Sequence, residues 1–249
     1  MYIELMLLAM LIFPIWGISG MILKKETPFA AIGMGTIFAG VGSMIVIGLV
    51  STGGQSLGAL MEEYIKKSVD LILSSPQYMD MLKEAGIKAE NAETYLSTLY
   101  TNIASILPAI ILTISAIISY FEYNLLIKIR YRKVKGFKPL AYVRNFSLQN
   151  KDVIGWFAIY CIAYLLQFVG VGGATETVLN INVLVETIFS LQGISFIMLF
   201  CFTKRIPKAI PVIGIIILWM FPVGKTVLFT LGLLDMLMNF RGRIQQTKL

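Results

Sequence analysis

Long apolar runs separated by short charged stretches dominate the chain. Most of these runs reach the ~20 residues that a helix needs to cross a bilayer. The pattern predicts an all-α fold, a polytopic transmembrane helix bundle that makes residues 1–249 a single integral membrane domain. The six apolar segments are 3–23, 28–50, 103–127, 153–171, 178–202 and 209–240.

The last apolar segment allows two arrangements, because Pro211, Pro222 and Gly224 interrupt it. A single kinked and tilted helix fits its length. A hairpin that folds back near Phe221 fits the charges better, although each arm is then short for a ~30 Å hydrocarbon core. The hairpin brings the number of apolar segments to seven.

One long polar stretch, 51–102, separates the second and third apolar segments. Its apolar residues recur at helical spacing, and the pairs Glu62–Lys66 and Glu63–Lys67 stand one turn apart in the favoured order. Ser74-Ser75-Pro76 and Gly86 predict breaks. We therefore expect an insertion of two or three short amphipathic helices on or above the membrane, the last leading into the third span.

Basic residues cluster in alternate loops, which predicts the orientation of the chain. They gather at 24–26, 128–151 and 204–208, whereas 51–102 is acidic. Positive loops stay in the cytoplasm, so we expect the basic loop 128–152 inside and the insertion outside. A final hairpin places the basic tail inside as well, and a single crossing places it outside.

Composition narrows the function further. The chain is 57% hydrophobic and 14% charged, with a mean hydropathy of +0.79, which excludes an ordinary soluble domain. The net charge of +7 resides in the loops between spans, so it predicts no nucleic-acid partner. The chain has no histidine, and no metal-ligand cluster or catalytic set emerges. We expect no cofactor and no enzymatic activity; an intramembrane enzyme ranks third among the hypotheses.

The fifth apolar segment carries a polar face. Asn182, Glu186, Phe189 and Gly193 are spaced 4, 3 and 4 residues apart, so a helix places them on one side. A charged carboxylate at bilayer depth costs at least ~2.5 kcal/mol, and this face should therefore point into the bundle or a wet cavity. It is either a substrate or ion site, with Glu186 as its charged member, or polar contact between helices.

The candidate substrate-binding residues are Asn182, Glu186 and three further polar residues. Gln192 lies in the same segment, and Lys225 and Asp235 lie in the last one. If Lys225 is buried it needs an acidic partner, and Glu186 or Asp235 can supply one. If it sits at a hairpin tip, it extends to the surface instead.

Short motifs in the second half of the chain resemble the YybS-like family of uncharacterised bacterial membrane proteins. The closing stretch from Gly232-Leu-Leu-Asp235 to Arg241-Gly-Arg243 is similar to the closing signature of that family. Other shared features are Ile106-Leu-Pro108-Ala, an Asn at 180 or 182 followed by Leu191-Gln192-Gly193, and Pro207-Lys208. The family usually has additional apolar segments before the equivalent of Ile3, so this chain looks short at its N-terminus.

The resemblance implies a function, because YybS-like proteins look distantly similar to the substrate-binding S components of energy-coupling-factor vitamin transporters. Such a subunit works with a membrane coupling protein and cytoplasmic ATPases. We therefore expect a small-solute binding or transport subunit in the lipid bilayer. The alternative is a non-transport scaffold that docks envelope or division partners, itself or other membrane proteins.

Overall fold

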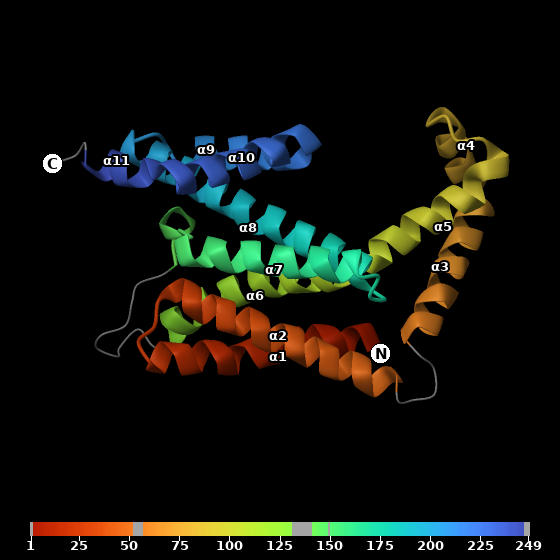
Figure 1. Cartoon of the computed structure of the whole chain (residues 1–249), viewed down its shortest axis with the longest axis horizontal. Coiled ribbons are helices and arrows are strands. Elements are labelled where there is room, and N and C mark those ends of the chain that lie inside the picture. Colours follow the sequence, from red (N-terminus) through yellow and green to blue (C-terminus); the bar gives the residue numbers. More distant parts are fainter. Residues whose placement is uncertain (1, 52–56, 131–140, 149, 247–249) are drawn as a thin grey trace.

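The computed structural model describes residues 2–51, 57–130, 141–148 and 150–246, and every regular element in them is a helix (Figure 1). The all-α prediction is confirmed. The elements are α1 (Tyr2–Leu23), α2 (Pro28–Ser51), α3 (Leu57–Leu73), α4 (Pro76–Glu84), α5 (Ala89–Ser105), α6 (Leu107–Ile129), the 3₁₀ turn η1 (Val143–Asn145), α7 (Asn150–Phe168), α8 (Ala174–Thr203), α9 (Ala209–Met220), α10 (Pro222–Met238) and α11 (Phe240–Gln246).

Four helices, α1, α2, α6 and α8, are long and apolar enough to cross a membrane. The apolar part of α7, Val153–Phe168, is shorter. The last predicted segment is a pair, because α9 and α10 meet at a bend of 118°. The described residues thus hold four spanning helices, or five if the bent pair counts as one span.

Small residues let α1, α2 and α6 pack closely. Ala39 of α2 is fully buried. A Cβ atom at Gly35 would lie 2.7 Å from the side chain of Ile18 in α1 and 2.9 Å from Ser119 Oγ in α6. Gly42 similarly faces the ring of Phe13. Small side chains at helix interfaces allow this approach in membranes.

The polar insertion forms three helices, α3, α4 and α5. The predicted breaks are confirmed, since α3 ends at Leu73 and Gly86 adopts a φ of 81° in the turn between α4 and α5, a conformation that glycine reaches without strain. The helix α3 packs against α5. A hydrogen bond from Lys67 to Glu63 at 2.6 Å raises the pKa of the Lys67 ammonium group above its ordinary value.

Different segments of the chain lie at the two ends of the bundle (Figure 1). The N-terminus and the insertion α3–α5 lie at one end. The segment 141–148, α11 and the C-terminus lie at the other, which we call the basic end because the predicted basic loops join the helices there. Part of the loop 128–152, namely residues 131–140 and 149, lies outside the described residues.

Candidate functional site

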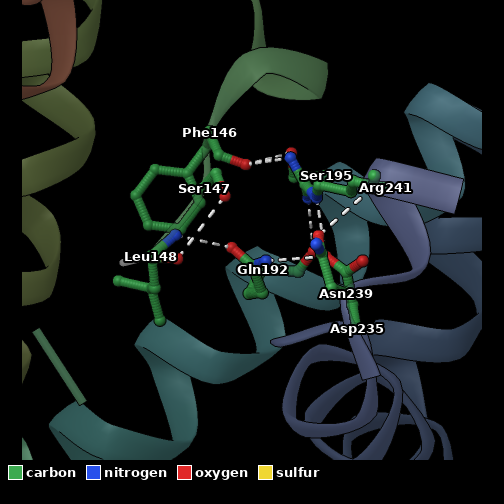
Figure 2. A network of polar contacts seen from close by, with 9 residues as sticks. Phe146, Ser147, Leu148, Gln192, Ser195, Asp235, Asn239 and Arg241 are labelled. Carbon is green, nitrogen blue, oxygen red and sulfur yellow. Dashed lines mark hydrogen bonds and ion pairs between the residues drawn. The ribbon is translucent and has the colours of Figure 1, made fainter. Parts of the chain in front are cut away.

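A buried ion pair lies at the basic end of the bundle (Figure 2). Arg241 Nε donates to Asp235 Oδ2 at 2.6 Å, with side-chain exposures of 12% for Arg241 and 0% for Asp235. Asp235 belongs to α10 and Arg241 to α11. The turn between these helices is made by Asn239, whose left-handed φ of 47° ends α10, so that Arg241 is directed back to the carboxylate.

Arg241 also joins two other parts of the chain. Its guanidinium donates to the carbonyl oxygen of Phe146 at 2.5 Å and to that of Gln192 at 3.3 Å. The first carbonyl belongs to the segment before α7, and the second to α8. Charge-assisted hydrogen bonds of this kind are about twice as strong as neutral ones. Arg241 thus holds the tail, α10, α8 and the segment 146–148 together.

Gln192 is the second connecting residue of this network. Its amide nitrogen donates to Asp235 Oδ2 at 2.6 Å, and its amide oxygen accepts from the backbone N–H of Leu148 at 3.0 Å. One helical turn away, Ser195 Oγ donates to the carbonyl oxygen of Phe146 at 2.7 Å. These bonds hold the segment before α7 against α8, whereas Asp235 Oδ1 is buried without a hydrogen-bond partner among the described residues.

A cavity of about 500 Å³ lies beside the network. Its polar walls are Asp235, Arg241, Gln192 and Asn239, and its apolar walls include Ile154. Small-molecule sites in proteins usually enclose ~300–1,000 Å³ and combine an apolar lining with a few converging polar groups. The cavity therefore has the size and lining of a site for a small polar solute.

Two glycines set the contact between α8 and α10. A Cβ atom at Gly193 would overlap the carbonyl oxygen of Leu228 and lie 3.1 Å from the nitrogen of Gly232. A Cβ atom at Gly232 would overlap the carbonyl oxygen of Phe189. The two backbones touch directly, and this approach brings Gln192 within hydrogen-bonding distance of Asp235.

The structure separates the predicted site residues into two groups. Gln192 and Asp235 lie together at the basic end, in the network just described. Asn182 instead bonds the hydroxyl of Tyr160 in α7. Glu186 is exposed on the surface of the chain, contrary to the expectation that it points into the bundle. Lys225 is exposed as well, with its ammonium group 5.7 Å from the centre of the Trp219 ring.

The sequence did not reveal the role of Arg241, which was considered only as a tail charge and as part of the closing family signature. One feature of the sequence could have indicated this role. Arg241 follows Asp235 by six residues, and Asn239 between them is a residue type that tolerates a left-handed turn. Reasoning also missed Asn180, whose amide group bridges the junction of α5 and α6. Its Oδ1 accepts from Ala109 N at 2.8 Å, and its Nδ2 donates to the Ser105 carbonyl at 2.6 Å.

The fold and the buried network define a polytopic helical membrane protein, which sits in the lipid bilayer. Residues 2–236 match the model of a family described as "Predicted membrane protein (DUF2232)". The chain belongs to this family, as the YybS-like motifs predict.

One curated relative is the "Uncharacterized protein YybS" of Bacillus subtilis (strain 168), which is 26% identical over 141 residues. The aligned region covers 55% of this chain and 44% of the relative, so the chain spans less than half of that protein. No solved structure matches the chain.

Proposed function

We propose that this protein is a small-solute binding or transport subunit of the bacterial plasma membrane. The observation that carries the proposal is the apolar helix pair α9–α10, which bends by 118° next to Phe221. The 12 residues of α9 extend ~18 Å at 1.5 Å per residue, less than the ~30 Å hydrocarbon core. The break at Phe221 therefore lies inside the bilayer.

A broken helix within a bilayer is informative, because the peptide groups at the break lose their helical partners. Non-helical backbone is tolerated there only where it is buried in protein or lines a water-filled cavity. In transporters, such discontinuous helices form the substrate site. The pair α9–α10 carries Lys225 next to the break and Asp235 at the cavity, which supports a role in holding a polar solute.

The proposal also covers the orientation of the chain, its lack of catalysis and its source of energy. The basic loops face the cytoplasm, the insertion α3–α5 faces outward, and the chain has no catalytic activity of its own. Under this proposal, energy for uptake comes from a membrane coupling protein with cytoplasmic ATPases, as the predicted resemblance to S components implies. The proposed site residues are Gln192 and Asp235 at the cavity, together with Asn182, Glu186 and Lys225.

The test is purification of the protein from native membranes in mild detergent, followed by mass spectrometry of retained small molecules and co-purifying proteins. A retained ligand that is lost in Glu186→Gln, but kept in the control Glu176→Gln, supports the proposal. Glu176 is an exposed carboxylate near the start of the same helix, so the control removes the same charge outside the bilayer. A change in detergent stability alone assigns the polar face a structural role.

A scaffold that docks envelope or division partners is the second candidate, and the insertion is the observation that favours it. Tyr64 and Leu71 lie seven residues apart on α3, with exposures of 65% and 70%, so they share one uncovered face. Envelope or division proteins that co-purify without any small ligand would favour this candidate. Charge reversal in the loop 128–151 should then release them.

A further inference from the structure

The helices α8 and α10 run in the same direction and in register. The start of α8 lies at the insertion end, where Asn180 bonds Ser105, and both helices proceed toward the basic end (Figure 1). They touch at Gly193 and Gly232. About one turn earlier in each helix, the rings of Phe189 and Phe229 lie 5.7 Å apart. The two helices therefore run side by side in parallel through these contacts, with residues near Gly193 lying close to residues near Gly232.

Glu186 and Lys225 occupy matching positions in this register. Glu186 precedes Gly193 by seven residues, and Lys225 precedes Gly232 by seven. Seven residues are nearly two complete turns and about 10 Å of helix. Each charged residue therefore stands at the same depth, on the side of its helix that faces the other helix.

Both charges lack an ionic partner in the described structure. Among the described residues, no side-chain hydrogen bond or ion pair is found for the Glu186 carboxylate. The Lys225 ammonium group lies over the ring of Trp219, 5.7 Å from its centre, and has no ion pair among these residues. Asp235, the other acid considered for Lys225, is already paired with Arg241. Both side chains are exposed, and the start of α10 lies away from α8 in the described arrangement (Figure 1).

We propose that Glu186 and Lys225 form an intramembrane ion pair that closes the tip of the α9–α10 hairpin against α8. An unpaired charge at bilayer depth costs at least ~2.5 kcal/mol, so each residue gains by meeting the other. The described arrangement is the open one. Closure pivots α10 about the glycine contact, and the break at Phe221 gives the tip freedom to follow.

The formation of the ion pair does not depend on the proposed function. Its role as a gate, however, rests on the proposed transport function. In a transport subunit, closing the tip shuts the space between α8 and α10 toward the insertion end while the network at Asp235 stays fixed. Glu186 and Lys225 are then positioning residues for the hairpin. Two experiments distinguish a failure of the pair from a failure of the transport proposal.

The first experiment is a charge exchange in the full chain, reconstituted in lipid nanodiscs. Glu186→Gln and Lys225→Gln should each lower the thermal midpoint by about 2–4 °C, and the two effects should not add in the double variant. The exchange Glu186→Lys with Lys225→Glu should restore most of the loss. Controls are Glu176→Gln and Lys208→Gln, which remove exposed charges near the helix ends. Additive losses, or an exchange that restores nothing, would overturn the pair.

The second experiment measures proximity, and it remains informative if the charge variants fold poorly. Cysteines replace Glu186 and Lys225 in a chain whose Cys161 and Cys201 are serine, and oxidation follows in native membranes. Cross-linking within one chain is the expected result, and a cross-linked chain should lose uptake if the pair acts as a gate. Cross-linked dimers, or no cross-link at all, overturn the pairing within the chain. Cross-linking without an effect on uptake keeps the pair and removes its role as a gate.

Discussion

Arg241 and Asp235 form an ion pair whose Nε–Oδ2 distance is 2.6 Å and whose carboxylate is fully buried. A buried charge pair is not strongly stabilising by itself, because both ions have left water. Removing one partner is costly, however, since the other charge then stays buried alone. This asymmetry makes the pair a sensitive point for testing the structure.

Arg241→Gln should destabilise the protein by about 3–5 kcal/mol, because it leaves the Asp235 carboxylate without its cation. Thermal or denaturant unfolding in detergent measures the loss. Arg205→Gln is the control, since Arg205 is an exposed arginine of the loop between α8 and α9. The double variant Asp235→Asn with Arg241→Gln should lose less than Arg241→Gln alone. Equal stability of Arg241→Gln and the control contradicts the buried pair.

Gly193→Ala should separate α8 from α10, because the added Cβ would overlap the carbonyl oxygen of Leu228. Overpacking of this kind typically costs about 1–3 kcal/mol. The loss should appear as a lower thermal midpoint. The control is Gly155→Ala in α7, where a Cβ meets nothing within 4 Å and alanine favours the helix. Equal midpoints for the two variants would show that the helices do not touch at Gly193.

Asn180→Asp should destabilise the junction of α5, α6 and α8 by about 1–3 kcal/mol. A carboxylate retains the acceptor for Ala109 N, but it has no N–H for the carbonyl oxygens of Ser105 and Glu176, which the Asn180 amide contacts at 2.6 and 2.7 Å. Urea unfolding in detergent reports the change. Asn102→Asp, at an exposed position of α5, should be nearly neutral. The contact is refuted if both variants unfold at the same urea concentration.

The C-terminal tail should lie on the same side of the membrane as the basic loop, because Arg241 bonds the carbonyl oxygen of Phe146. Fusions at the C-terminus and within the loop 128–151 test this prediction. At both positions, a fused green fluorescent protein should fluoresce and a fused alkaline phosphatase should be inactive, as is expected of cytoplasmic positions. An active phosphatase at the C-terminus alone would mean that the last segment crosses once.

The periodicity of apolar residues was sufficient to predict the helices, because their lengths and breaks are local properties. The breaks at Ser75 and Gly86 follow directly from proline and glycine chemistry. The arrangement of α9 and α10 was left open, since length favoured one form and charge the other. The bend of 118° and the contact of Arg241 with Phe146 support the hairpin.

The candidate site was harder to predict, because its members meet only through tertiary contacts. Gln192 and Asp235 were selected as buried polar residues of apolar segments, and they do lie together. Glu186 was expected to share their environment, since it lies on the same helix face as Gly193. The separation of α8 and α10 beyond the glycine contact places it elsewhere, and no local pattern encodes that separation.

The order of residues in the network has a consequence for biosynthesis. Asp235 and Gln192 precede Arg241 in the chain, as do both arms of the α9–α10 hairpin. During translation the hairpin enters the membrane before its cation exists, with a carboxylate still unmatched. The ion pair can form only after Arg241 has left the ribosome, whereas the contacts of Gln192 and Gly193 with α10 need no residue beyond Asp235. Arg241 therefore adds the last bonds of the network to a hairpin that already lies against α8.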